Sequence, residues 1–446
     1  MKRPLQILKE SAVWVLFFFA VSPALAEPKP WIGKFTADRI VVASSPENTF
    51  QILKRVISQA QDTIYISVYI LDNVYIADEL ERAISERKVK VHLLLEGSPV
   101  PKVPEVELYI AKRLTELGAK AYFYDLGEGR AHRRFKYLHN KYAVIDKRWV
   151  VVGSANYGSR GHPLDPSYGN REWEVVIEDP AAVKLYLNAF AHDARKRSEW
   201  VAYGKSERYR LKDPSFEPER KVRKGSYPLR LKPIEVHDVP ALTLFSPDNS
   251  LDEKKGMLAY LKKAKRSVWI EQLTLERYWG LKTYNPEPEP SKLIQILYEL
   301  AEKGVGIRVL LNDDNIFREK EAPMLFEFED TDSTGFSWIK KDSAQKSKKP
   351  PRDNRSTIQE LMAEAKKHAW DLKAHLFDHK NCDLRVLHNK GMIVDGELTM
   401  IGSLNWGESA LKFNREAGIL LKSGKVAGYY QKTFEYDWKC SARNTH

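Results

Sequence analysis

The stretch YLHNKYAVIDKRWVVVGSANYG, Tyr137–Gly158, is written a second time in this chain of 446 residues. The second copy is VLHNKGMIVDGELTMIGSLNWG, Val386–Gly407. Both copies read His-Asn-Lys, then Asp, then Gly-Ser-x-Asn at the same internal spacings, and the second histidine follows the first by 249 positions (388 − 139). A repeat over such a distance indicates two structural units built on one plan.

The segments around each copy also repeat in the same order. Ser44–Asn48 (SSPEN) matches Phe245–Asn249 (FSPDN), and each is followed by a periodic helix, a strand, a second helix and a second strand. Apolar β-branched runs separated by amphipathic helices predict an α/β fold around a largely parallel, buried sheet. The expected helices are 50–60, 76–87, 181–196, 254–264, 291–303 and 426–436, and the expected strands are 63–71, 89–95, 267–275 and 305–311.

The length of the chain fits two or three domains rather than one core. We expect two similar α/β domains, 27–203 and 241–446, joined by a linker, 204–240, which is rich in proline and charge and lacks hydrophobic periodicity. Residues 1–26 precede the first domain and are not expected to belong to the fold.

These first 26 residues are typical of a secretory signal peptide. Basic residues precede the apolar run SAVWVLFFFAVSPALA, which ends in the small-x-small pattern Ala24-Leu25-Ala26. We therefore expect an exported protein (secreted, periplasmic or on the cell surface), with an uncleaved N-terminal membrane anchor as the alternative. Export permits a disulfide, but the sequence leaves open whether Cys382 and Cys440 pair.

The charge of the chain suits an anionic partner. Lys and Arg number 72 against 60 Asp and Glu, a formal net charge of +12. Phosphates, nucleic acids and anionic lipid headgroups are the partners that such a balance favours, although a solvated lysine-rich surface is an equal alternative. No Cys/His set has the spacing of a zinc site and no acidic cage is evident, so we expect no metal and no cofactor.

The repeated motif places an imidazole and an ammonium together. The strand-like KYAVID puts His139 and Lys141 on one face, and Ser154 and Asn156 follow a second strand. Lysine, asparagine and serine can donate hydrogen bonds to phosphoryl oxygens, and a histidine can act as nucleophile or proton carrier. The second copy supplies the same groups, which are His388, Lys390, Ser403 and Asn405.

Each copy is followed by the tripeptide Asn-Arg-Glu, which ends at Glu172 in the first half and at Glu416 in the second. A glutamate behind a histidine can hold the ring in one tautomer through the far nitrogen, as in a catalytic triad. The aspartates of the motif, Asp146 and Asp395, are counted with the catalytic set, but we expect them to support the strand turn rather than contact the substrate.

The two HxKxxxxD motifs, HNKYAVID and HNKGMIVD, resemble those of the phospholipase D superfamily, and the resemblance covers nearly the whole chain after residue 26. It implies two phospholipase D-like α/β domains packed face to face as a pseudo-dimer with one active site at their interface, within a monomeric chain. It also implies that one histidine, which we assign as His139, attacks phosphorus to form a phosphohistidine. The other, His388, is then the acid and base, Lys141, Lys390, Asn156 and Asn405 hold the phosphoryl group, Ser154 and Ser403 assist, and Glu172 and Glu416 orient the histidines.

The substrate class stays open between alternatives. Export and the aromatic segments 277–284 and 324–338 favour a phospholipid, cleaved or transferred by a phospholipase D-type phosphodiesterase at a membrane surface. The net charge and the lysine-rich 346–349 instead suit nucleic acid and an exported metal-independent nuclease. A cardiolipin synthase-like transferase and a non-catalytic phosphate-binding module are the remaining alternatives.

Overall fold

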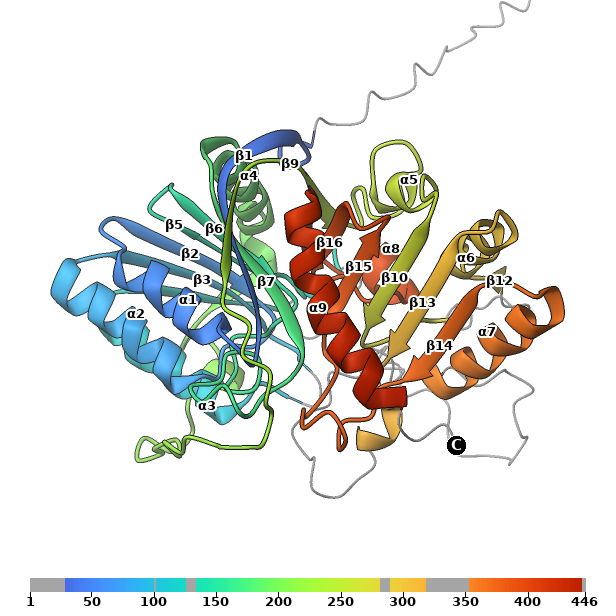
Figure 1. Cartoon of the computed structure of the whole chain (residues 1–446). Coiled ribbons are helices and arrows are strands. Elements are labelled where there is room, and N and C mark those ends of the chain that lie inside the picture. The colour runs from blue at the N-terminus through green and yellow to red at the C-terminus, as the bar shows by residue number, and fades with distance from the viewer. Residues whose placement is uncertain (1–28, 100–101, 126–133, 281–288, 318–352, 443–446) are drawn as a thin grey trace, which may run out of the picture.

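A computed structural model of the chain describes residues 29–99, 102–125, 134–280, 289–317 and 353–442. The N-terminal half and the C-terminal half lie side by side, and the long strands β1 and β9 run together where they meet (Figure 1). Within the first half the elements are β1 (Lys34–Ser45), α1 (Thr49–Ser58), β2 (Thr63–Val68), α2 (Val74–Arg87), β3 (Lys90–Glu96), α3 (Glu105–Glu116), β4 (Lys120–Tyr124), β5 (Lys141–Ile145), β6 (Trp149–Gly153), β7 (Glu172–Glu178), α4 (Pro180–Arg195) and β8 (Trp200–Ala202).

The second half repeats this order with short additions. Its elements are β9 (Ile234–Ser246), α5 (Met257–Leu261), β10 (Ser267–Gln272), β11 (Tyr278–Trp279), β12 (Glu289–Pro290), α6 (Lys292–Glu302), β13 (Gly306–Leu311), α7 (Asn354–His368), β14 (Leu372–Leu376), β15 (Lys390–Val394), β16 (Leu398–Gly402), α8 (Glu408–Lys412), β17 (Glu416–Lys422) and α9 (Gly424–Ser441).

One sheet of fifteen strands passes through both halves, in the order β14-β13-β10-β15-β16-β17-β9-β1-β7-β6-β5-β2-β3-β4-β8. The order is nearly symmetric about the junction of β9 and β1, which pair antiparallel. The α/β fold class and the internal duplication are therefore confirmed. The expectation of a largely parallel sheet is wrong, because among the strands that the structure describes only β2–β3–β4 and β10–β13–β14 pair parallel, apart from isolated bridges. The motif strands instead pair antiparallel as β5-β6-β7 and β15-β16-β17, and short turns join β5 to β6 and β15 to β16.

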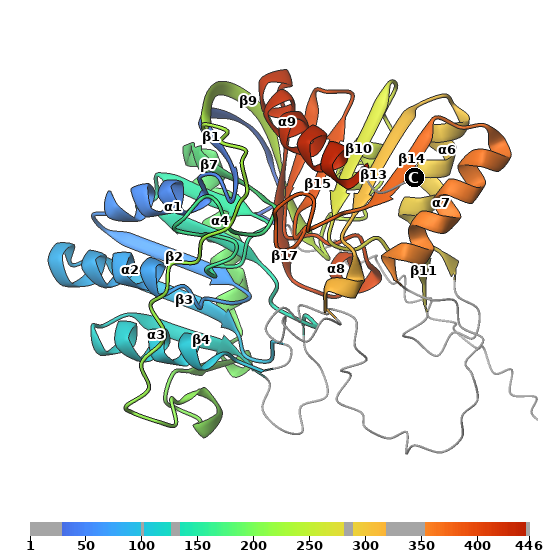
Figure 2. The same cartoon turned by 60° about the horizontal axis from the view of Figure 1, so that its bottom comes forward.

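The two halves share a hydrophobic core. One buried cluster contains Val152 and Val175 of the first half together with Ile401 and Ile419 of the second. Helices α1, α2 and α3 cover the outer face of the first half, and α6 and α7 cover that of the second (Figure 2). The helices that end each half begin at side-chain caps: Asp179 accepts a hydrogen bond from the backbone of α4 and Ser423 from that of α9.

The stretch assigned to the linker contains structure that the sequence did not predict. Its last residues, from Ile234 onward, form the first part of β9 and pair with β1. Neither β1 nor β9 shows strict alternation, because the later residues of each are buried at successive positions, on both faces of the sheet. Within the linker, Tyr227 is fully buried; its hydroxyl bonds to Arg171 and Glu47 of the first half, and its ring meets that of Tyr436 of the second.

The two cysteines left open by the sequence are joined. Cys382 and Cys440 form a disulfide with 5.2 Å between their Cα atoms. The bond ties the segment that precedes His388 to the end of α9. Among the residues that the structure describes, no helix combines the length and the apolar character that crossing a bilayer requires.

Candidate active site

The repeated motif lies at the start of two equivalent strands. Lys141 is the first residue of β5 and Lys390 the first of β15, so each histidine stands two positions before its strand. The carbonyl of the residue between histidine and lysine accepts a backbone hydrogen bond in both halves, from Tyr69 N in one and from Leu273 N in the other. Both motifs are therefore anchored in the same way to the residue that follows the neighbouring antiparallel strand, β2 in one half and β10 in the other.

A short backbone pairing then joins each histidine to the other half of the chain. The amide of His139 donates to the carbonyl of Arg415 over 2.9 Å. The amide of His388 donates to the carbonyl of Arg171 over 3.1 Å. Since a glutamate follows each arginine, this pairing brings the glutamate of one half beside the histidine of the other.

The two glutamates are consequently exchanged between the halves. His139 Nδ1 lies 2.7 Å from Glu416 Oε2, and His388 Nδ1 lies 2.7 Å from Glu172 Oε1. All four side chains are buried. The repeat predicted that glutamates stand behind the histidines, and only the fold shows that neither histidine is served by its own half. One active site at the interface follows from this geometry.

Each carboxylate fixes the chemistry of its imidazole. An ionised carboxylate only accepts hydrogen bonds, so the proton is held on Nδ1 and Nε2 is the nitrogen that faces the reaction. Burial alone would raise the pKa of Glu172, but the charge and hydrogen bond of His388, the charge of Lys390 and the hydroxyl of Ser154 bring that pKa below its usual value. Glu172 is therefore ionised at neutral pH.

The motif lysines cover the outer nitrogens. Lys141 Nζ lies 2.7 Å from His139 Nε2, and Lys390 Nζ lies 2.9 Å from His388 Nε2. Both ammonium groups also donate to the carbonyl of the same histidine. A phosphoryl group attacked by Nε2 would meet the ammonium at once, which suits stabilisation of its negative charge.

The two motif serines differ in what they contact. Ser154 Oγ donates to Glu172 Oε2 over 2.6 Å and accepts from the amide of Trp173. Ser403 Oγ donates to the carbonyl of Ala417 over 3.2 Å and accepts from the amide of the same residue. Ser154 therefore positions the carboxylate that pairs with His388, and Ser403 holds the start of β17. Substrate contact by either serine stays a prediction.

Four asparagines surround these groups. Asn414 Nδ2 donates to Glu416 Oε1 over 3.1 Å and Asn170 Nδ2 donates to Glu172 Oε1 over 3.4 Å, roles that sequence reasoning did not assign. The signal was present, because both asparagines belong to the repeated Asn-Arg-Glu tripeptide. Asn156 and Asn405 follow the motif serines by two positions, and their binding of phosphoryl oxygens stays a prediction.

The motif aspartates lie away from this centre. Asp146 follows the last residue of β5, at the opposite end from Lys141, and accepts from three backbone amides, 61 to 63, at 2.6–3.0 Å. Asp395 binds the amides of 265 to 267 in the same way at the end of β15. Their oxygens are engaged with backbone amides and hold the turns that lead into β2 and β10, as expected, and their place in the catalytic set remains for a kinetic test.

The arginines of the tripeptide are the largest feature that sequence reasoning missed. Arg171 Nε lies 2.6 Å from Asp437 Oδ2 of α9, and Arg415 Nε lies 2.9 Å from Asp193 Oδ2 of α4. Both guanidinium groups have no exposed surface. Each half thus inserts an arginine beneath the last helix of the other, directly behind the residues that pair with the histidines.

The two halves of the site are not identical. The ring of Tyr69 meets His139 edge-on with 4.8 Å between centroids, and Lys141 Nζ lies 5.4 Å from the centre of the same ring. Leu273 stands at the matching position in the second half, to judge by its bond to the second motif. The position next to the first motif is therefore aromatic, and the matching position next to the second is aliphatic.

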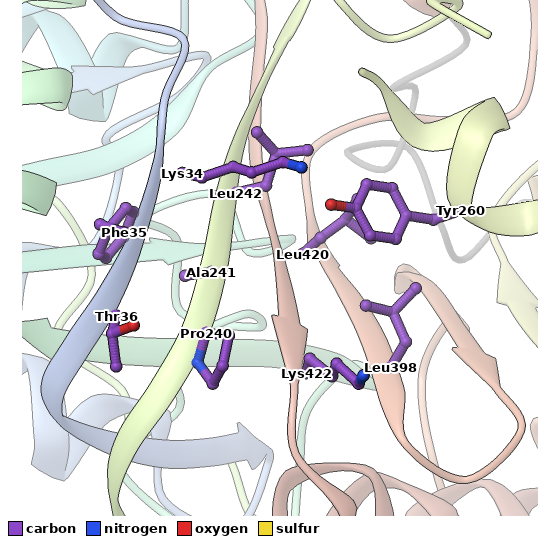
Figure 3. A pocket seen from close by; sticks show the side chains of 10 residues that line it. All are labelled: Lys34, Phe35, Thr36, Pro240, Ala241, Leu242, Tyr260, Leu398, Leu420 and Lys422. Carbon is purple, nitrogen blue, oxygen red and sulfur yellow. The ribbon is translucent and has the colours of Figure 1, made fainter. Parts of the chain in front are cut away.

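The surroundings of the site are described in part. The aromatic segment 324–338 and the lysine-rich 346–349 lie outside the described residues, as do residues 281–284 of the aromatic segment 277–284. A groove of about 350 Å³ lies elsewhere, between β9 and Tyr260, with Leu398 and Lys422 along its side (Figure 3). It borders the ends of β16 and β17 remote from Ser403 and Glu416, so it is not the reaction site. No group of three or more potential metal ligands gathers in the described part of the chain.

Comparisons with known proteins match this geometry. The family model described as "Cardiolipin synthase, PLD-like domain" matches residues 53–194 and again 257–438. A curated relative, cardiolipin synthase B of Shigella flexneri, is 23% identical over 182 residues, which are 39% of this chain and 43% of the relative. The match therefore spans less than half of that relative.

One solved structure shares the fold over most of both chains, and a second matches more weakly. Phosphatidylserine synthase of Haemophilus influenzae superposes with a TM-score of 0.58 at 13% identity, over 92% of this chain and 88% of that one. Nuc, a phospholipase D family member of Salmonella typhimurium, gives a TM-score of 0.30 at 18% identity, over 38% of this chain and 99% of that one. With both of its halves matched by the family model, and with two His-Lys motifs meeting at one interface, the chain belongs to the PLD-like family of the phospholipase D superfamily.

Proposed function

We propose that this protein is a phospholipid phosphodiesterase or phosphatidyltransferase that works through a phosphohistidine. The observation that carries the proposal is the reciprocal pairing of His139 with Glu416 and of His388 with Glu172, each imidazole with a lysine ammonium at its outer nitrogen. Two oriented imidazoles at one site suit a reaction in two displacements.

The proposed chemistry uses one histidine for the bond to phosphorus and the other for protons. Nε2 of His139 attacks phosphorus, the bond from phosphorus to the leaving oxygen breaks, and His388 gives its proton to that oxygen. His388 then takes a proton from the incoming water or alcohol, whose oxygen attacks phosphorus and displaces His139. Lys141 and Lys390 offset the charge on the phosphoryl oxygens throughout.

A phospholipid is favoured as the substrate because the matching family model and the two synthases named above are all described by lipid synthesis. Those names favour transfer to an alcohol at least as much as hydrolysis. Since one chain supplies both half-sites, we expect a monomer to be active. The activity of this protein is a proposal, because the curated relative is matched over only part of its length.

The test offers the purified protein vesicles of phosphatidylglycerol or phosphatidylcholine, with and without glycerol as acceptor, and in parallel single-stranded and duplex DNA, all without added metal. Headgroup release, or exchange with the added alcohol, is the expected result. Cleavage of DNA that resists EDTA, with both lipids untouched, would replace the lipid proposal by the nuclease alternative.

The roles of the histidines have their own test. Replacing either His139 or His388 by alanine is expected to abolish turnover, while His237→Ala, an exposed histidine on β9, keeps it. Labelled phosphohistidine should accumulate in the His388→Ala protein and not in the His139→Ala protein. The reverse pattern would exchange the two roles, and turnover in either variant would defeat the shared-site mechanism.

We also propose that the protein is exported. The signal-like segment 1–26 lies outside the described residues, and the support within them is the Cys382–Cys440 disulfide, which suits an oxidising compartment. The N-terminus of the protein recovered from its native host should begin at Glu27. Recovery with residues 1–26 still attached would favour the anchor instead.

A further inference from the structure

A second buried histidine–glutamate pair lies next to the site, in the first half only. His162 Nε2 lies 2.9 Å from Glu174 Oε2, and His162 Nδ1 lies 3.1 Å from the backbone carbonyl oxygen of Asn156. Both side chains are at most 1% exposed. Neither residue belongs to the repeated motif, and none of the steps proposed above uses them.

The partners of His162 determine its protonation state. A carbonyl oxygen and a carboxylate both accept hydrogen bonds, so both ring nitrogens must carry a proton and the ring is an imidazolium paired with Glu174. Burial alone would lower the pKa of His162, but the charge and hydrogen bond of Glu174, the carbonyl of Asn156 and the charge of Glu172 raise that pKa above its usual value. The ring of Tyr157 also lies close to that of His162, edge-on with 5.1 Å between centroids.

The loop that carries His162 is built around this contact. Gly161 passes so close to Asn156 that a Cβ at Gly161 would lie 2.8 Å from the Asn156 carbonyl oxygen. Thr49 Oγ1 binds the carbonyl of Gly161, and Asn73 Nδ2 binds that of His162. The loop is therefore fixed from α1 and from the start of α2, with its imidazolium aimed at Asn156.

The side-chain amide of Asn156 is held close to the site. Its Oδ1 is buried and has no hydrogen-bond partner within the part of the chain that the structure describes. That oxygen is an acceptor, so the atom that can donate to a phosphoryl oxygen is Nδ2 of the same amide. Asn156 stands two positions after Ser154, whose hydroxyl contacts Glu172. The position of the Asn156 backbone therefore decides where the side-chain amide of Asn156 would meet a phosphoryl group.

In the second half, uncharged residues stand at the positions that correspond to His162 and Glu174. Leu411 N donates to the carbonyl of Gly407 just as His162 N donates to that of Gly158, so Leu411 stands in the place of His162. Gly418 occupies the place of Glu174, two residues after the tripeptide glutamate. The pair is thus a property of the first half and not of the repeated plan.

We propose that His162 is a positioning residue which, paired with Glu174, holds the Asn156 carbonyl and fixes Asn156 for phosphoryl binding in the first half of the site. This inference rests on the proposed function in one respect, the binding of a phosphoryl group by Asn156. It requires no contact between His162 and the substrate.

The test is a double-mutant cycle on the binding of inorganic phosphate, measured by isothermal titration calorimetry on the full chain. The variants are His162→Leu/Glu174→Gly, which copies the residues of the second half, Asn156→Ala, and their combination. The His162/Glu174 change should weaken phosphate binding roughly tenfold in the native background, the size expected for one hydrogen bond from a charged donor. It should cost almost nothing where Asn156 is already alanine.

An equal loss in both backgrounds would overturn the inference, because independent sites add and coupled ones do not. A change in melting temperature with no change in phosphate affinity would overturn it too. If the paired variant does not fold, His162→Gln enters the same cycle. His92→Gln, a half-buried histidine on β3, is the matched control and should leave phosphate affinity unchanged.

Phosphate binding also separates this inference from the proposed function. If the double-mutant cycle shows coupling between His162/Glu174 and Asn156 but the protein turns over no lipid, the role of His162 is supported and the lipid activity is refuted. Lipid turnover with an additive cycle keeps the activity and removes the role of His162.

Discussion

Replacing Glu416 by glutamine should disable His139, although the two residues belong to different halves. The carboxylate accepts from Nδ1 at 2.7 Å, and the two side chains are 0% and 1% exposed, so water screens the interaction very little. A hydrogen bond to a charged group contributes about 1.5–3 kcal/mol. If that contribution is lost in the transition state, kcat falls roughly 10- to 150-fold, since each 1.36 kcal/mol is tenfold in rate.

The assay has a kinetic arm and a spectroscopic arm. Steady-state turnover of phosphatidylglycerol gives kcat for Glu416→Gln, and ¹⁵N spectra of the histidine rings report the tautomer at each site. The glutamine should shift the ring nitrogens of His139 and leave those of His388 in place. Glu178→Gln is the control, because Glu178 ends β7 in ion pairs with Arg39 and Arg148, far along the strand from Glu172.

The pairing of each histidine with the glutamate of the other half would be refuted if the ring nitrogens of the other histidine shifted instead. If Glu416→Gln shifted the His388 nitrogens and spared those of His139, each histidine would be served by its own half. A variant that kept at least half of the native kcat would show that the carboxylate contributes no more than packing.

Four further outcomes follow from particular contacts. Arg171→Met should lower the free energy of unfolding by about 3–5 kcal/mol in urea titrations, because it leaves buried carboxylates without their counter-charge; an unchanged midpoint would contradict this. Asp395→Ala should lower the free energy of unfolding by roughly 1–3 kcal/mol and leave kcat unchanged. Burial alone would raise the pKa of Asp395, but the hydrogen bonds from backbone amides lower it. The destabilisation should therefore be full above the pKa of the unfolded state and fade as the pH falls through the pKa of the folded state; a loss of kcat would return Asp395 to the catalytic set. Reduction of the Cys382–Cys440 disulfide should lower the melting temperature, since a 58-residue separation corresponds to about 4 kcal/mol of chain entropy; equal melting with and without reductant would speak against it. His162→Gln should destabilise more at pH 6 than at pH 9.5, because a raised folded pKa contributes stability that is present below the unfolded pKa and lost as pH rises through the folded one; a difference in urea midpoint that does not vary with pH would refute the imidazolium.

The helices and strands with clear periodicity were predictable. The expected helix 76–87 is α2, Val74–Arg87, and the expected strand 305–311 is β13, Gly306–Leu311. The expected helix 254–264 shrinks to α5, Met257–Leu261, where a turn precedes the short helix. The strands β1 and β9 were missed because they cross the centre of the sheet, where burial on both faces removes the alternation that marks a strand.

The sequence by itself determined that the chain is duplicated, that each half carries a histidine and a lysine two positions apart, and that a glutamate follows each motif. These are local patterns, and spacing along the chain is enough to reveal them. Only the tertiary structure decided which glutamate serves which histidine, that Ser154 binds a carboxylate, that Arg171 and Arg415 cross between halves, and that His162 stands behind Asn156. Those contacts join residues as far as 277 positions apart. They depend on the antiparallel pairing of β1 with β9, which sets one half against the other and which no local pattern encodes.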